Sequence, residues 1–136
     1  MKYLIDANVL SEATRPQPSA VVVQWLRDHE RDLIVTPIVL GEIEYGILQM
    51  PSGRKRTQLL AWFREGVQHL QCVDLDNQTA TVWASLLARL KSKGRSMPVK
   101  DSLIAASALQ HQFTIVTRNL ADFQHVGVPL IDPFED

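Results

Sequence analysis

The sequence has very little that would stabilise a fold covalently. Its 136 residues include a single cysteine, Cys72, so no disulfide can form within the chain. Apolar residues make up 46% of the sequence, and a chain of this length and composition can bury a core without cross-links. A lone cysteine in such a protein is typical of a small core residue in a reducing compartment. We therefore expect Cys72 to be buried and the protein to be cytoplasmic.

Long apolar runs and a strong excess of one charge are also missing. No segment is long enough to cross a bilayer, and the N-terminus lacks the pattern of a secretory signal peptide, so we expect no membrane association. The formal net charge of −1 argues against a grip on nucleic acid over the whole surface. Positive charge is local instead, at residues 91–100 and 54–56. Taken alone, each of these clusters fits a solvated surface turn better than a binding site.

The signatures of several common enzyme classes are absent as well. The sequence contains no Gly-x-Ser-x-Gly motif of serine hydrolases, and residues 51–55 lack the spacing of a phosphate-binding P-loop. The four histidines are scattered and do not have the spacing of a zinc site. Asn8 stands where phosphatases with a nucleophilic aspartate after the first strand usually carry a second aspartate. These classes therefore fit the sequence poorly.

Short apolar runs alternate with helical patterns along the chain. The runs that predict strands are residues 3–5, 33–35, 70–73, 114–116 and, more weakly, 130–131. Periodicity and capping residues predict helices at 9–12, from 19 onward, at 36–49, 57–68 and 76–91, and from 98 onward. Such alternation gives a parallel sheet with helices on both faces. The sequence thus predicts an α/β fold and, since no linker or repeat is present, a single domain over residues 1–136.

Acidic residues fall where the strands of such a sheet end. Asp6 directly follows the first strand, and Glu42 lies near the start of the helix after the second. Asp101 lies in the first turn of a helix that leads into a strand, and Thr117 and Asn119 follow that strand. Ligands of open parallel sheets bind at the carboxyl ends of the strands. We therefore expect these side chains to meet at one edge of the sheet.

Each of these residues also fits a purely structural role. Asp6 suits the N-cap of the helix that begins near Val9, and Asp101 suits the positive end of its own helix. Helical geometry does not choose between Glu42 and Glu44, and asparagine at position 119 is common in turns. It is their expected convergence that favours a site. Clustered carboxylates raise each other's pKa, and a cation relieves the repulsion; hard oxygen ligands suit Mg²⁺ or Mn²⁺.

Four motifs, in this order, resemble those of the PIN-domain ribonucleases, in particular the VapC-type toxins of bacterial toxin–antitoxin pairs. Singly the motifs are weak, but together they span nearly the whole chain. A further segment, residues 11–26 with Arg-Pro-Gln-Pro at 15–18, resembles the FitB-like branch. The four motifs are Leu-Ile-Asp-Ala-Asn-Val-Leu-Ser-Glu at 4–12, Glu-Ile-Glu-Tyr-Gly at 42–46, Asp-Ser-Leu-Ile-Ala-Ala-Ser-Ala at 101–108 and Thr-Arg-Asn-Leu-Ala-Asp-Phe at 117–123.

The resemblance implies a three-layer α/β/α fold and RNA cleavage that depends on Mg²⁺ or Mn²⁺. Asp6, Glu42 and Asp101 match the family's acidic positions, and the glutamate-to-glycine spacing selects Glu42 over Glu44. Asn119 occupies the fourth acidic position, with Asp122 nearby to act through water. Ala7 departs from the threonine or serine that is usual after the first aspartate. The implied partners are RNA and a cognate VapB-like antitoxin, with a homodimer that forms a heterotetramer or larger assembly.

The resulting hypothesis assigns a role to each residue of this edge. Asp6 and Asp101 hold the ion, and Glu42, directly or through water, joins them and activates the attacking water. Thr117 and Asn119 position water or metal by hydrogen bonds. The basic residues Arg95, Lys100 and Arg118 are candidates for holding RNA phosphates, although ordinary surface charge explains them equally well. The alternative function is a weakly active or inactive PIN domain that serves as the binding partner of a DNA-binding antitoxin.

Overall fold

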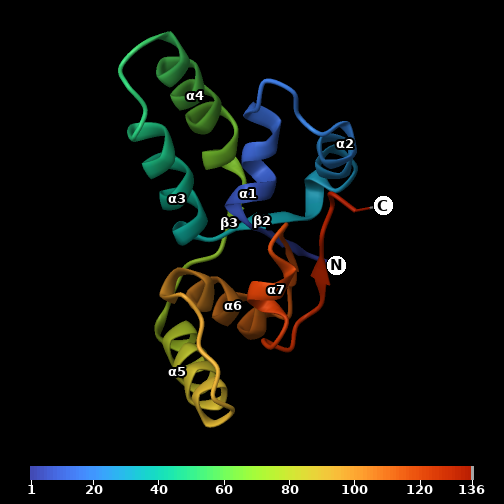
Figure 1. Ribbon diagram of the computed structural model, residues 1–136, viewed down its shortest axis with the longest axis vertical. Coiled ribbons are helices and arrows are strands. Elements are labelled where there is room, and N and C mark those ends of the chain that lie inside the picture. The colour runs from blue at the N-terminus through green and yellow to red at the C-terminus, as the bar shows by residue number, and fades with distance from the viewer. Residues whose placement is uncertain (136) are drawn as a thin grey trace.

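Five short strands form one parallel sheet in the computed structural model, which describes residues 1–135 (Figure 1). The strand order is β3-β2-β1-β4-β5. The three central strands are mainly apolar and mostly buried, because helices cover both faces of the sheet. The strand bounds are β1 Tyr3–Ile5, β2 Leu33–Val35, β3 Gln71–Cys72, β4 Thr114–Val116 and β5 Leu130–Ile131.

Helices lie in two groups on opposite sides of this sheet. In Figure 1, α1 to α4 lie above the strands, and α5 to α7 lie below them. This arrangement confirms the three-layer α/β/α fold. The helices are α1 Ala7–Leu10, α2 Ala20–Asp28, α3 Pro37–Leu48, α4 Arg54–Glu65, α5 Asn77–Ser92, α6 Val99–His111 and α7 Leu120–Phe123, with short 3₁₀ turns at Ser11–Thr14, Glu30–Asp32 and Val67–His69. No helix within residues 1–135 is long and apolar enough to cross a membrane.

Local sequence explains where the longer helices begin. The Thr36 side chain accepts a hydrogen bond from the backbone N–H of Val39 at 3.3 Å, and Pro37 occupies the first turn of α3. Asp76 and Thr79 form a reciprocal capping box at the start of α5. Each of these caps satisfies backbone donors that a helix start leaves without an intrahelical partner.

One buried cluster connects both helical layers through the sheet. Leu4, Ile5 and Ile115 at its centre are fully buried, and Phe63 and Phe123 pack into it from opposite layers. At roughly 25 cal/mol per Å² of apolar surface removed from water, such burial is the main force that holds the layers together. It also fixes the positions of the strand ends that carry the polar residues described below.

Four details differ from the sequence-based expectations. Helix α1 begins at Ala7 and not at Val9, because the carboxylate of Asp6 caps it directly. Helix α4 spans Arg54–Glu65, three residues earlier than expected at each end. Strand β3 is shorter than the expected 70–73, and Cys72 is exposed, so the expectation of a buried cysteine is wrong. The reason is tertiary: β3 is an edge strand, and its side chains are less covered than those of the central strands.

The connections of the sheet diverge between β1 and β4. From β1 the chain moves outward through β2 to β3, then crosses to β4 and moves outward on the other side to β5. Loops that leave two neighbouring strands in opposite directions open a crevice at the carboxyl ends of those strands. Asp6 and Thr117 directly follow β1 and β4, so the fold places both at this crevice.

Candidate active site

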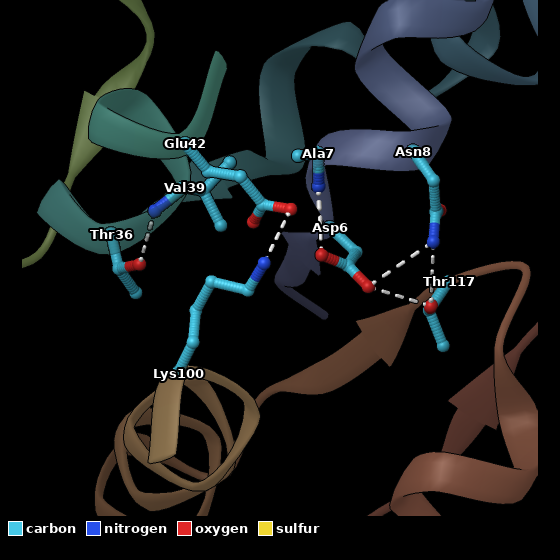
Figure 2. A network of polar contacts seen from close by, with 8 residues as sticks. All are labelled: Asp6, Ala7, Asn8, Thr36, Val39, Glu42, Lys100 and Thr117. Atoms are coloured by element: carbon cyan, nitrogen blue, oxygen red, sulfur yellow. Dashed lines mark hydrogen bonds and ion pairs between the residues drawn. The ribbon is translucent and has the colours of Figure 1, made fainter. Parts of the chain in front are cut away.

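Asp6 is held in a fixed orientation at the end of β1. Strands β1 and β4 pair Ile5 with Val116, which makes the next residues, Asp6 and Thr117, neighbours across the sheet. The Thr117 hydroxyl donates a hydrogen bond to Asp6 Oδ2 at 2.8 Å, and the backbone N–H of Ala7 donates to Oδ1 at 2.8 Å (Figure 2). The capping role of Asp6 and its place at the site are therefore compatible. Thr117 positions this carboxylate, which the sequence analysis did not specify.

Asn8 is a member of the site to which the sequence analysis assigned no role. Its side-chain nitrogen lies 3.4 Å from both Asp6 Oδ2 and Thr117 Oγ1, and its Oδ1 accepts the backbone N–H of Arg118 at 3.2 Å. The two longer contacts are weak by the usual distance criteria. Together the three contacts connect the segments after β1 and β4. The sequence feature that could have indicated this role is the position of Asn8, two residues after Asp6 in the first turn of the helix that Asp6 caps.

Burial raises the pKa of Asp6 above its ordinary value, and the hydrogen bonds from Thr117 and Ala7 offset part of that rise. The negative charge of Glu42 raises this pKa further, and the positive charge of Lys100 lowers it. The direction agrees with the expectation for clustered acids. The main cause is the loss of water around the carboxylate, however, and repulsion between acids is secondary.

Glu42 approaches the crevice from α3, and a lysine from the opposite layer meets it. The Lys100 ammonium, on the first turn of α6, lies 2.9 Å from Glu42 Oε2 (Figure 2). The two side chains are 49% and 31% exposed, so water partly surrounds the pair. The other oxygen, Glu42 Oε1, is buried and has no hydrogen-bond partner within residues 1–135. The structure thus brings Glu42 to the site, as the glutamate-to-glycine spacing indicated.

Asp101 belongs to the same first turn of α6, and a buried serine fixes that turn. The Ser102 hydroxyl donates to the Val99 carbonyl at 2.6 Å and accepts the indole N–H of Trp83 on α5 at 2.8 Å. Burial raises the pKa of Asp101, and the negative charges of Asp6 and Asp122 raise it further. Asp101 therefore lies close enough to Asp6 for their charges to interact. We call the edge of the crevice that carries Asp6, Glu42 and Asp101 the rim.

Within residues 1–135, the side chains of the other candidate residues make no hydrogen bond to Asp6, Glu42 or Asp101. The Asn119 backbone N–H donates to Thr117 Oγ1 at 3.0 Å, but its side chain is exposed and does not cap α7. The Arg118 guanidinium lies 4.3 Å from the centre of the Phe134 ring. Arg95 lies 2.7 Å from His125 Nε2. Among the described ion pairs, only that of Lys100 involves an acid of the rim.

The donor atoms of the rim fit a hard cation in part. Within residues 1–135, no three side chains of the His, Cys, Asp and Glu types lie close enough together to hold a metal ion as placed. Two features nevertheless suit a hydrated ion: the carboxylates of Asp6 and Asp101, whose charges interact, and the buried Glu42 Oε1, which lacks a partner and is available for a water molecule. The ammonium of Lys100 occupies the remaining side of Glu42. The residues thus fit one cation at the two aspartates better than two cations across the whole rim.

A mainly apolar groove of about 280 Å³ adjoins these acids. It starts at Asn8 and Glu42 and runs between α1, α3 and α4 to Met50, Leu59 and Trp62. An apolar groove that ends at a charged cluster suits a ligand with an apolar body and a charged end.

Comparison with models of protein families gives a match over most of the sequence. The model described as the PIN domain matches residues 3–129. The chain belongs to the PIN domain family. This result confirms the family inferred from the four motifs.

Relatives of this PIN domain match over nearly their whole length. The toxin FitB of Neisseria gonorrhoeae is 30% identical over 98% of this chain and 99% of its own. The VapC ribonuclease Y4jK of Sinorhizobium fredii is 28% identical over 97% of this chain and 97% of its own. A solved structure of FitAB bound to an IR36 DNA fragment superimposes with a TM-score of 0.92 at 29% identity, over 98% of this chain and 96% of that one.

Proposed function

We propose that this PIN domain is a metal-dependent RNA endonuclease and the toxin of a toxin–antitoxin pair. The observation that carries the proposal is the position of Asp6 at the crevice where the sheet connections diverge, where the negative charges of Glu42 and Asp101 interact with it. The relatives named as a toxin and as a VapC ribonuclease support the same activity. We also propose that residues 1–136 act as one domain, in the cytoplasm.

Asp6 and Asp101 would hold the divalent ion, Mg²⁺ or Mn²⁺. When bound, such an ion lowers the pKa of a water molecule and neutralises negative charge on the phosphate. Thr117 keeps the Asp6 carboxylate oriented through its 2.8 Å hydrogen bond. The unpartnered Oε1 of Glu42 would orient the attacking water and accept its proton. Asn119, which is exposed and whose backbone N–H donates to Thr117, would position water at the edge of the site.

Basic residues around the rim would hold the RNA backbone. Arg118 is exposed and follows Thr117 directly, so it is the best placed to contact a phosphate beside the acids. Arg95, which is exposed on the loop before α6, would extend the contact along the strand of RNA. Such contacts fix the register of the substrate without reading its bases.

The apolar groove beside Glu42 is our proposed docking site for a VapB-like antitoxin. Apolar side chains of the antitoxin would pack against Met50, Leu59 and Trp62. An arginine or lysine at the end of that segment would meet the acids in place of the metal's charge. As the family resemblance implies, we propose that a homodimer of this chain carries two antitoxin chains in a heterotetramer or larger assembly.

The test of the activity is cleavage of RNA by the purified protein with Mn²⁺. We expect cleavage to stop with chelator and to fall by roughly 100-fold or more in Asp6→Asn. Asp74→Asn, an exposed aspartate on another loop, is the matched control, and His111→Ala should also cleave normally. Products should end in 5′-phosphate and 3′-hydroxyl groups, because water attacks the phosphate and the 3′ oxygen leaves, taking up a proton. Cyclic 2′,3′-phosphate ends formed in chelator would contradict this mechanism.

The same preparation separates the nuclease from the alternative function. A protein that binds the product of the neighbouring gene but cleaves no RNA with any divalent ion would be a binding partner of a DNA-binding antitoxin. The Lys100–Glu42 ion pair is the observation that favours this alternative, since it occupies one of the three acids.

A further inference from the structure

The rim of the sheet carries a positive charge of its own, the ammonium group of Lys100. Lys100 and Asp101 are consecutive residues of α6, and consecutive helix positions are about 100° apart around the axis. One helical turn therefore delivers an ammonium toward Glu42 and a carboxylate toward the side of Asp6. Figure 2 shows the Lys100 side chain extending from α6 to the carboxylate of Glu42 on α3, beside Asp6. The lysine thus connects the two helical layers at the crevice.

The fold sets the backbone positions from which the two side chains of this pair extend. The hydrogen bond from Trp83 on α5 to Ser102 holds the first turn of α6, which carries Lys100. Glu42 belongs to α3 in the opposite layer. The resulting pair has a short 2.9 Å contact between Nζ and Oε2. The hydrogen bond to Glu42 is the main cause that raises the pKa of Lys100, and the negative charges of Glu42, Asp101 and Asp6 add to it.

Charge balance gives this arrangement a consequence. The three acids of the rim carry three negative charges, and Lys100 neutralises one of them. One divalent ion then balances the remaining two. Without the lysine, the same three carboxylates would favour a second cation beside Glu42.

We propose that Lys100 takes the place of a second metal ion, so that this site binds one divalent ion on Asp6 and Asp101 while Glu42 acts without contacting it. The inference rests on the proposed metal-dependent nuclease and specifies how its site is filled. It also changes the role that the sequence suggested for Lys100, because an ammonium committed to Glu42 is not free to hold an RNA phosphate. The pair orients Glu42, with Oε2 occupied and Oε1 available for water.

Calorimetric titration of Mn²⁺ into metal-free protein tests the proposal without measuring cleavage. Wild type should bind one ion per chain. Lys100→Met removes the competing charge and should tighten binding about tenfold, the effect expected for one charge in a half-exposed site. Lys100→Arg, which keeps the charge, should bind as wild type. Lys91→Met is the matched control, because it removes an exposed lysine from the last turn of α5, and it should change nothing.

A double-mutant cycle then separates a metal ligand from a partner of the lysine. Glu42→Gln alone leaves Lys100 unneutralised and should weaken Mn²⁺ binding about tenfold. Combining Glu42→Gln with Lys100→Met removes the pair without changing the net charge, so the affinity should return to within about threefold of wild type. If the double variant binds as weakly as Glu42→Gln, then Glu42 is a ligand and the proposal is wrong. Circular dichroism of each variant checks that the fold is retained.

Failure of this inference and failure of the proposed function give different results. Wild type that binds Mn²⁺ and cleaves RNA, with Lys100→Met identical to Lys91→Met, overturns only the role of the lysine. Two ions per wild-type chain would do the same. Wild type that binds no Mn²⁺ and cleaves nothing overturns the metal-dependent nuclease itself.

Discussion

The two halves of the rim are built in different ways. On the side of β1 and β4, the residue Asp6 is 5% exposed, and its carboxylate accepts hydrogen bonds from the Ala7 backbone and the Thr117 hydroxyl. On the side of α3 and α6, Glu42 and Lys100 form an ion pair. The Glu42 side chain is 31% exposed and the Lys100 side chain 49% exposed. The first half depends on strand pairing, whereas the second depends on two long side chains that extend from separate helical layers.

This difference indicates which half sets the geometry and which half adjusts to a ligand. Hydrogen bonds to a buried charge cost free energy when they are lost, because the charge then has no replacement partner. A half-exposed ion pair contributes little to stability, because water replaces each partner. We therefore expect the Asp6 half to hold the ion in place, and the Glu42 half to respond to metal, substrate or antitoxin.

The largest effect should come from breaking the fixed half at Thr117. Thr117→Val keeps the shape but removes the hydroxyl that donates to Asp6. We expect a loss of roughly 1–3 kcal/mol in the free energy of unfolding, because a buried carboxylate oxygen loses its partner. Mn²⁺ affinity should fall by roughly 10- to 100-fold, as for other residues that orient a metal ligand. Chemical denaturation and calorimetry measure the two losses.

The control for that change is Thr81→Val on the exposed face of α5. The Thr81 hydroxyl donates only to the Asn77 carbonyl of its own helix, at 3.3 Å. This variant should bind Mn²⁺ as wild type does. Equal effects of the two substitutions would remove the distinction between the halves.

A smaller effect should follow from loosening the start of α6. Trp83→Phe removes the indole N–H that donates to Ser102, at a cost of about 1 kcal/mol in the free energy of unfolding. Because Asp101 and Lys100 share this turn, Mn²⁺ affinity should also fall, by roughly threefold. Ser102→Ala tests the coupling: combined with Trp83→Phe, it should lower the affinity no further than it does alone.

The titration of Asp6 should appear as a pH-dependent difference in stability. Its pKa is raised in the folded state, so between the unfolded and the folded pKa the folded protein binds more protons than the unfolded one, and stability falls as the pH rises through this interval. In chelator, the melting temperature of Asp6→Asn minus that of wild type should therefore increase from about pH 4 upward, by roughly 2 °C, and then level off. A difference that decreases over the same range would contradict the raised pKa.

The smallest effect should come from the exposed ion pair. In chelator, Lys100→Met should lower the free energy of unfolding by less than about 1 kcal/mol, because the pair is partly solvated. Adding salt should reduce the difference further, since salt screens exposed charges. A loss as large as that of Thr117→Val would show that both halves are equally rigid. Melting curves at low and high salt measure it.

The sequence by itself determined the class of fold and the family. Short apolar runs predicted the five strands, although β3 is an exposed edge strand, and the four ordered motifs predicted Asp6, Glu42 and Asp101 as the acids of the site. The caps at Thr36 and Asp76 were also predictable, because a cap depends on a few adjacent residues. Local rules were sufficient for these features.

Only the tertiary structure decided how the side chains meet. The register of β1 against β4 turns Thr117 into the donor that fixes Asp6, and the edge position of β3 exposes Cys72. The contact between Lys100 and Glu42 joins residues 58 positions apart on opposite helical layers. No local pattern encodes such a contact, because it depends on how both layers pack on the sheet. The sequence predicted that the acids lie at one edge of the sheet, and the packing of the two helical layers brings Lys100 into contact with Glu42.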